Sequence, residues 1–266
     1  MAGSGKAHMR PEGDRILEVN DLTVEFNLGR GKVVKAVSGI SLDLIRGETL
    51  AIVGESGCGK STLGKAILQL PKPTSGSVNF LSKELTTMNK HDLREMRPAM
   101  QMIFQDPISS LDPRLPVSEV LAEPLRVWNR GNEVEINEKI DELLRAANLD
   151  PAVVRDRRSY EFSGGQCQRI SIARALALDP TMIICDEPVS ALDVSVQAQI
   201  LNLLQDMKDR YGLTLIFISH DLAVVKAVST RVMVMYLGKV CEVAPPDDVY
   251  LRTRHHYTKA LVGSVP

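Results

Sequence analysis

The residues with the clearest chemistry lie in two glycine-rich segments that are far apart in the sequence. The first, residues 54–61, reads Gly-Glu-Ser-Gly-Cys-Gly-Lys-Ser and fits the pattern G-x-x-x-x-G-K-[ST] at each required position. The second, residues 162–168, reads Phe-Ser-Gly-Gly-Gln-Cys-Gln. Glycines let the backbone curl so that its N–H groups face an anion, and the dipole of a following helix favours negative charge. Two such anion cradles predict a nucleotide held between two protomers.

The first segment predicts a phosphate-binding loop. In such a loop Lys60 reaches the β- and γ-phosphates, Ser61 ligates Mg²⁺, and Thr62 adds a contact to the α-phosphate. The alternative is a glycine-rich turn that happens to precede a helix; the strand-like run before the loop and the periodic helix after it favour the phosphate site. The residues expected to bind the nucleotide here are Gly54, Glu55, Ser56, Gly57, Cys58, Gly59, Lys60, Ser61 and Thr62.

Two carboxylates, Asp186 and Glu187, end the apolar run at residues 182–185. An acid at the end of a strand beside a phosphate loop can hold Mg²⁺, and this is the role expected of Asp186. Glu187 lies one residue beyond and could polarise a water aimed at the γ-phosphate. The alternative is a pair of solvated carboxylates that start a turn before Pro188.

Two other polar residues follow apolar runs in the same way. His220 comes after residues 214–219, and Gln105 comes after residues 100–104. Ligand sites of α/β proteins gather at the carboxyl ends of the strands, which favours a functional role for both. Taken alone, each signal is weak, because a surface histidine and an ordinary loop amide are the alternatives. The Gln105 amide could bond water or an oxygen bound to Mg²⁺.

Apolar patterning predicts the elements that position these residues. Strands are predicted at residues 16–19, 22–26, 40–44, 49–53, 100–104, 182–185, 214–219 and 231–236. Gly29 and Gly31 mark a hairpin or loop. Helical spacing of Leu63, Ala66, Ile67 and Leu70 predicts a helix that stops at Pro71. The alternation of strands with helices predicts an α/β fold with a mostly parallel sheet, covered on both faces.

Between residues 106 and 161 the pattern changes. Prolines break up its beginning, and a single apolar stripe then predicts a helix at Ile136, Ile140, Leu143, Leu144 and Ala147. We expect a disordered leader at residues 1–13 and one domain at residues 14–266. Within that domain, residues 14–105 and 162–243 form the core, residues 106–161 form a helical subdomain, and residues 244–266 form a short tail.

The composition excludes some classes of protein. A net charge of −1 over 266 residues gives no bulk electrostatic case for binding nucleic acid. No apolar run approaches the ~20 residues that a membrane helix requires, so a membrane span would come from another chain. The N-terminus lacks the apolar core of a signal peptide, which is typical of a cytosolic protein. The four cysteines are scattered and have no cluster spacing, which favours free thiols.

Taken together, these motifs resemble the ATP-binding cassette family. Phe162-Ser163-Gly164-Gly165-Gln166 is similar to the family signature, with Phe162 in place of the commoner leucine. Residues 190–193, Ser-Ala-Leu-Asp, resemble the loop through which two cassettes contact each other. The phosphate loop, Gln105, the signature, Asp186–Glu187, residues 190–193 and His220 occur in the order of the family. The resemblance covers residues 16–243 and implies a P-loop NTPase (RecA-like) core with an N-terminal antiparallel β subdomain and a helical insertion.

The resemblance also implies a mechanism. Two cassettes would face head to tail, with ATP and Mg²⁺ held by one protomer's phosphate loop and the other's Ser163, Gly164, Gly165 and Gln166. Glu187 would act as general base, and His220 would contact the γ-phosphate. Gln105 would ligate the metal and link the site to the helical insertion, and Asp193 would lie at the protomer contact. Phe26 is the candidate to stack on adenine, with a plain core aromatic as the alternative.

Finer resemblance points to a subgroup. Residues 162–169, 184–194 and 257–261 are similar to the dipeptide and oligopeptide importer ATPases, especially the second of their two ATPase subunits. That group includes nickel and glutathione importers. His256 replaces the usual proline, and the cysteine-bearing tail that binds an iron–sulfur cluster in many relatives is not seen here, so no cluster is expected.

The resemblance implies partners and a location as well. We expect permease subunits, a sister ATPase in a heterodimer or a homodimer, an extracytoplasmic binding protein acting indirectly, and no nucleic acid. The location would be the cytoplasmic face of the inner membrane, with peripheral attachment through the permease. The alternatives are a cassette ATPase that acts on nucleic acid or ribosomes, and a regulatory module that no longer hydrolyses ATP. The intact Glu187 and His220 argue against the last.

Overall fold

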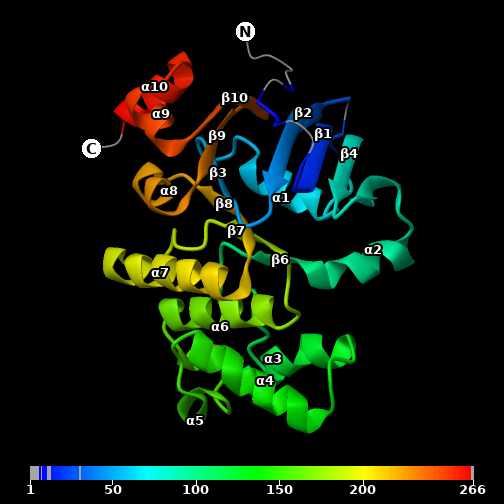
Figure 1. Ribbon diagram of the computed structural model, residues 1–266, viewed down its shortest axis with the longest axis vertical. Coiled ribbons are helices and arrows are strands. Elements are labelled where there is room, and N and C mark those ends of the chain that lie inside the picture. Colours follow the sequence, from blue (N-terminus) through cyan, green and yellow to red (C-terminus); the bar gives the residue numbers. More distant parts are fainter. Residues whose placement is uncertain (1–5, 7, 11–12, 30, 265–266) are drawn as a thin grey trace. The chain divides into compact units, whose positions relative to one another are not determined.

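The computed structural model describes residues 6, 8–10, 13–29 and 31–264 (Figure 1). The chain forms two compact units, of which the first comprises residues 1–96 and 214–266 and the second residues 97–213. The predicted α/β class with an antiparallel N-terminal sheet is confirmed. The predicted domain boundaries stay a prediction.

Parallel strands form the centre of the first unit. Strand β3 (Thr49–Val53) lies between β8 (Thr214–Ser219) and β9 (Arg231–Tyr236) and pairs with both in parallel. Each residue of β3 is buried, because a strand with neighbours on both sides and helices nearby excludes water from both faces. Strand β10 (Lys239–Ala244) continues the sheet antiparallel to β9. Helices α1 (Lys60–Ile67) and α8 (Leu222–Val228) follow β3 and β8.

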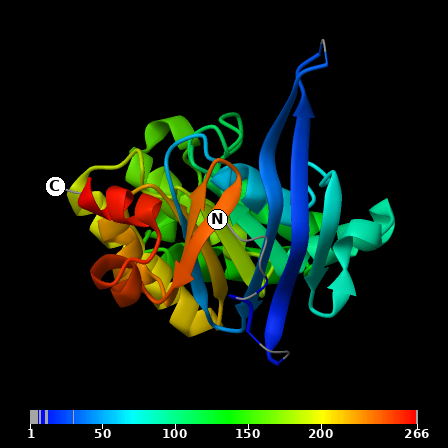
Figure 2. The same ribbon diagram turned by 90° about the horizontal axis from the view of Figure 1, so that it is seen from above.

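An antiparallel sheet also belongs to the first unit, with the order β2-β1-β4-β5. Its strands are β1 (Arg15–Asn27), β2 (Val33–Ile45), β4 (Ser75–Phe80) and β5 (Lys83–Glu84). Figure 2 shows β1 and β2 side by side as a long hairpin, which confirms the predicted turn. The two strands predicted at residues 16–19 and 22–26 are one strand, because pairing with β2 continues across a bulge at which Asp21 adopts φ +48°.

A buried group of ions joins distant segments of the first unit. Arg10 and Arg231 both pair with Asp43 and Glu48, whose side chains are 0% and 4% exposed. These contacts hold part of the segment that was predicted as a disordered leader; residues 1–5, 7, 11 and 12 of that leader lie outside the described residues. Opposite charges on both sides lower the pKa of Asp43 even though its burial alone would raise it.

Short helices complete the first unit. Helices α9 (Pro246–Leu251) and α10 (His256–Gly263) pack against β10, and α2 (Lys90–Met96) follows the 3₁₀ turn η1 (Leu85–Thr87). Helix α1 ends at Ile67, so the predicted extension to Leu70 is wrong. Gln69 adopts φ +59° and donates its N–H to Ala66, which closes the helix before Pro71.

The second unit has a parallel strand pair and a stack of helices. Strands β6 (Met100–Ile103) and β7 (Met182–Asp186) pair in parallel. The helices and 3₁₀ turns are η2 (Arg97–Ala99), α3 (Val117–Val127), α4 (Glu133–Ala146), α5 (Pro151–Val154), η3 (Ser159–Glu161), α6 (Gly164–Leu176) and α7 (Val194–Tyr211). Helix α6 packs against α3, α4 and α7 (Figure 1).

Helix α4 shows how the sequence specifies this packing. Asn132 accepts hydrogen bonds from the N–H groups of Val134 and Glu135, and the Glu135 carboxylate accepts the Asn132 N–H in return. This capping box starts the helix. The predicted apolar stripe along it is buried throughout, from Ile136 to Ala147. Within the described part of the chain, no helix combines the length and apolar character needed to cross a bilayer.

Candidate functional site

Residues 54–61, hereafter the glycine loop, connect β3 to α1 in the first unit. Gly54, Gly57 and Gly59 have φ angles of +152°, +77° and +104°, a region that other residues rarely adopt. Backbone also passes very close to two of them. A Cβ built on Gly54 would lie 2.2 Å from the Met235 carbonyl oxygen, and one on Gly59 would lie 2.1 Å from that of Ala36. Glycine is therefore required at both positions, by conformation and by space.

Lys60 lies inside the curve of this loop. Its Nζ donates to the carbonyl oxygens of Gly54, at 2.8 Å, and of Glu55, at 2.9 Å, and the residue is only 4% exposed. The loop thereby holds a positive charge beside backbone N–H groups that precede a helix, an arrangement suited to a polyphosphate. Burial raises the pKa of the neighbouring Cys58 thiol, so this thiol is neutral.

Strand pairing brings the glycine loop and His220 to the same sheet edge. Val53, at the end of β3, pairs with Ser219, at the end of β8, so Gly54 and His220 each follow a paired strand end. Asp221 then caps α8 by accepting the N–H groups of Ala223 and Val224. The first unit thus supplies the glycine loop and an exposed histidine at the carboxyl ends of adjacent parallel strands.

Phe26 lies on β1 in the first unit, opposite Val34 of β2. Its side chain is 41% exposed, which is not the burial of a core aromatic. A ring with this much exposed surface is available to a planar ligand. Its stacking on adenine stays a prediction.

The second unit repeats this arrangement with β6 and β7. Ile103 pairs with Cys185, and the chain then continues into Gln105 on one strand and into Asp186 and Glu187 on the other. The Gln105 Nε2 donates to the Glu187 Oε2 at 3.1 Å. Two of the predicted site residues are therefore in direct contact. Asp186 is 2% exposed at the end of β7.

The backbone of Glu187 is strained. Its φ is +47°, in the left-handed region that a residue with a long side chain seldom occupies, which costs about 1–3 kcal/mol. The Glu187 carbonyl oxygen accepts both the N–H of Ser190, at 3.3 Å, and its hydroxyl, at 3.1 Å. A tight turn thus aims the carboxylate and leads to Asp193, the exposed residue from which α7 begins. Strain of this kind is typical of functional sites.

Residues 162–166, hereafter the signature segment, form the start of α6. The Ser163 Oγ accepts the Gln166 N–H at 3.3 Å, and the Gln166 Oε1 accepts the Ser163 N–H at 3.0 Å, which makes a capping box. Gly165 is set by packing, because a Cβ there would lie 2.6 Å from the Val196 Cγ1 of α7. Phe162 is 9% exposed. The Arg157 guanidinium lies over the Phe162 ring, with its Cζ 4.5 Å from the ring centroid.

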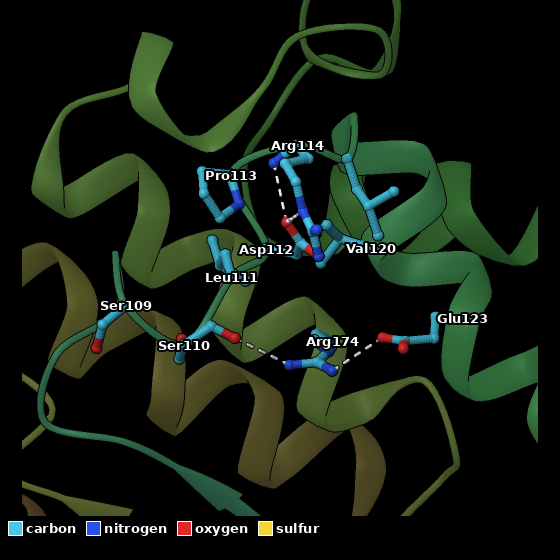
Figure 3. A pocket seen from close by; sticks show the side chains of 10 residues that line it. Ser109, Ser110, Leu111, Asp112, Pro113, Arg114, Val120, Glu123 and Arg174 are labelled. Carbon is cyan, nitrogen blue, oxygen red and sulfur yellow. Dashed lines mark hydrogen bonds and ion pairs between the residues drawn. The ribbon is translucent and has the colours of Figure 1, made fainter.

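A groove in the second unit lies beyond Gln105. It measures about 510 Å³ and is lined chiefly by residues 109–115 and by side chains of α3 and α6. Arg174 spans it, donating to the Ser110 carbonyl and to the Glu123 carboxylate, both at 3.1 Å (Figure 3). Hydrogen bonds from the Arg114 guanidinium lower the pKa of Asp112 to about 2. Sequence reasoning missed this groove, although the prolines after Gln105 did indicate an irregular loop there.

Sequence reasoning also missed a contact to the glycine loop. The hydroxyl of Tyr257, in α10, accepts the N–H of Glu55 at 3.1 Å. The Tyr257 ring packs on that of Tyr236, with the ring centroids 4.4 Å apart. No local pattern could have revealed it, because Glu55 and Tyr257 lie 202 residues apart in the sequence.

Comparison with known proteins defines the class. The sequence pattern of the family described as "ABC transporter" matches residues 37–190, more than half of the chain. Two solved structures share the fold at a TM-score of 0.79. One is the ATP-binding cassette MJ0796 bound to ADP and Pi in a dimeric post-hydrolysis state, 29% identical, covering 86% of this chain and 98% of that one. The other is cbiO1 from Clostridium perfringens, part of the ABC transporter complex cbiONQ, 30% identical, covering 91% and 93%. The chain belongs to the ABC transporter family and is an ATPase of that family.

Within the family, the chain is a relative of the oligopeptide transport ATP-binding proteins OppF. It is 51% identical to that of Salmonella typhimurium over 260 residues, which cover 94% of this chain and 78% of the relative. It is also 51% identical to that of Escherichia coli over 265 residues, with 96% and 79% covered. The subgroup predicted from the sequence is therefore confirmed.

Proposed function

We propose that this chain is the ATP-binding and ATP-hydrolysing subunit of an importer that takes up oligopeptides. Identity of 51% to two OppF proteins, over nearly the whole chain, supports this cargo. Uptake of nickel or glutathione is the alternative within the group. An ATPase acting on nucleic acid or ribosomes is less well supported, because the net charge is −1.

In this proposal the glycine loop binds the triphosphate. Its N–H groups and Lys60 contact the β- and γ-phosphates, and Phe26 stacks on adenine. Ser61, Gln105 and Asp186 would hold Mg²⁺, because a hydroxyl, an amide and a carboxylate offer the oxygen ligands that this hard cation prefers. When bound, Mg²⁺ would supply positive charge that offsets the charge on the phosphates.

Glu187 is the proposed general base, and His220 is proposed to contact the γ-phosphate. The observation that carries the catalytic proposal is the hydrogen bond from Gln105 to Glu187. A general base must be oriented before it can accept a proton from water. The amide of Gln105 and the strained backbone of Glu187 both fix the direction of this carboxylate.

The signature segment is proposed to act on a second protomer. The N–H groups of Gly164 and Gly165, at the start of α6, suit a γ-phosphate bound to the other subunit, with Asp193 at the protomer contact. A sister ATPase is the favoured partner, and a homodimer is the alternative. The capping box supports this role, because Ser163 and Gln166 hold the helix start in shape without a ligand.

The groove lined by residues 109–115 is proposed to receive a permease subunit. It is lined by the segment that follows Gln105, so a bound chain could shift Gln105 and through it Glu187. The protein would then work at the cytoplasmic face of the inner membrane, attached through the permease. A binding protein outside the membrane would deliver the peptide.

The test uses the importer complex reconstituted in vesicles. Glu187→Gln keeps the size and hydrogen bonding of the side chain but removes its basicity. We expect ATP affinity to persist while hydrolysis falls about 10²- to 10⁴-fold, the usual contribution of a general base. Glu138→Gln, an exposed change on α4, is the matched control. Hydrolysis near the normal rate in Glu187→Gln would reject the assignment.

The same vesicles test the cargo. Oligopeptide with its binding protein should stimulate hydrolysis and accumulate inside, whereas glutathione and Ni²⁺ should not. Stimulation by either of those instead would replace the peptide with the alternative cargo. Stimulation by RNA without any transport would favour the nucleic-acid reading.

A further inference from the structure

The C-terminal helix α10 reaches the glycine loop through one hydroxyl group. The Tyr257 Oη accepts the N–H of Glu55 at 3.1 Å. The carbonyl oxygen of the same residue accepts Lys60 Nζ, at 2.9 Å, and the N–H of Cys58, at 3.3 Å. The peptide groups of Glu55 therefore bond to Lys60 and Cys58 within the glycine loop and to Tyr257 of α10.

Tyr257 is itself firmly positioned. Its ring packs on Tyr236, the last residue of β9, and the Nδ1 of His255 accepts its backbone N–H at 3.2 Å. Glu242 of β10 accepts the N–H groups of Arg254 and His255, at 3.1 and 3.2 Å, which fixes the start of α10. The hydroxyl is thus presented from a rigid support.

Other contacts close the same loop from the end of β9 and from the β9–β10 turn. Gly238 donates its N–H to the Cys58 carbonyl at 2.9 Å, and Met235 lies against Gly54. These contacts restrain the middle and the first residue of the loop. In the ranges of the chain that the structure describes, the Glu55 N–H donates to the Tyr257 hydroxyl alone, so this hydroxyl restrains the part of the loop that β9 and the β9–β10 turn do not reach.

We propose that Tyr257 is a positioning residue for ATP binding, whose hydroxyl holds the glycine loop in the conformation that receives the triphosphate. It does not touch the reacting atoms. It orients the Glu55 peptide, whose carbonyl oxygen in turn places Lys60. The inference rests on the proposed role of residues 54–61 in binding phosphate. Burial raises the pKa of Tyr257, which keeps the phenol protonated at neutral pH.

The decisive variant is Tyr257→Phe, which removes the hydroxyl and keeps the ring on Tyr236. A net hydrogen bond to a backbone amide corresponds to a change of about two- to tenfold in an equilibrium constant. We therefore expect the Kd of the full chain for Mg-ATP, and the KM of the importer complex, to rise about two- to tenfold, with kcat nearly unchanged. Amide hydrogen exchange at Glu55 should become faster.

Tyr236→Phe is the matched control, because among the described residues the Tyr236 hydroxyl makes no hydrogen bond, while its ring makes the same stack. It should behave as the wild type does. Unchanged ATP affinity in Tyr257→Phe, unchanged exchange at Glu55, or an equal loss in Tyr236→Phe would each overturn the inference. Thermal unfolding of both variants separates loop positioning from general destabilisation, because a purely structural role lowers Tm without changing Kd.

The wild-type chain distinguishes failure of this inference from failure of the proposed function. A wild type that does not bind Mg-ATP would reject the phosphate role of residues 54–61, and the inference with it. A wild type that binds Mg-ATP beside a Tyr257→Phe variant of equal affinity would reject the inference alone.

Discussion

The glycine loop and the signature segment both rely on glycine, but for different physical reasons. In the glycine loop, Gly59 has φ +104° and a Cβ there would meet the Ala36 carbonyl at 2.1 Å. In the signature segment, Gly165 lies outside the left-handed region, and a Cβ there would meet only a side-chain methyl of Val196, at 2.6 Å. Gly59 is therefore required by its backbone conformation and by the neighbouring backbone, whereas Gly165 is required by the packing of α6 on α7.

The sources of order differ in the same way. The signature segment is held largely by its own side chains, through the Ser163–Gln166 capping box. The glycine loop is held by segments far along the chain, including Met235, Gly238 and Tyr257. A change outside the glycine loop should therefore alter ATP binding, while the signature segment should respond mainly to changes within α6 and α7.

The largest effect is expected from Gly59→Ala. Strained φ and overpacking against backbone together cost about 2–5 kcal/mol, and ATP binding should be lost. Denaturant unfolding measures the change in the free energy of unfolding, and titration with a fluorescent ATP analogue measures the loss of ATP binding. Gly57→Ala is the control, because its φ is +77° but a Cβ there meets nothing within 4 Å. Equal costs for the two variants would show that close backbone approach contributes nothing.

A smaller effect is expected from Gly165→Ala. The added methyl group must displace Val196, at a cost of about 1–3 kcal/mol in the free energy of unfolding. Adding Val196→Ala should recover much of this loss, because it removes the clashing methyl. Strictly additive costs in the double variant would contradict the packing explanation.

A still smaller effect on stability is expected from Ser163→Ala, at about 1 kcal/mol for a lost helix cap. In a mixed dimer it should impair hydrolysis at the partner's glycine loop rather than at its own. If Ser163→Ala impaired hydrolysis only at the mutated protomer's own site, the proposed action across protomers would be contradicted.

Gly164→Ala should change stability by less than about 0.5 kcal/mol, because a Cβ there lies 3.4 Å from Leu192.

The sequence predicted best those elements whose signal is local. The strands at residues 49–53, 214–219 and 231–236 have the predicted bounds, because each is a continuous apolar run between turns. The stripe of α4 is buried as expected. The signal failed at Asp21 and Gln69, where a bulge and a left-handed residue changed the element bounds. Such conformations depend on pairing with other strands or on how a helix ends.

The candidate site was predicted as a set of residues, but its contacts were not. Gln105 and Glu187 were each predicted as site residues, and the structure adds the hydrogen bond between them. The left-handed backbone conformation of Glu187 could not be predicted, because glutamate as a residue type does not favour it. The Tyr257 contact and the groove around Arg174 arise from packing between elements distant in sequence, which composition and spacing do not encode.

The place of β3 in its sheet has a consequence for synthesis on the ribosome. The two strands that pair with β3 are β8 and β9, and both are synthesised long after β3. Arg231, which completes the ion group around Asp43, belongs to β9 and is therefore also synthesised late. The second unit is one continuous segment, residues 97–213. Because chains fold as they emerge, the second unit can fold while β3 still exposes both edges. We therefore expect the glycine loop to reach its final conformation only after β8 and β9 have been synthesised, although residues 54–61 are translated early.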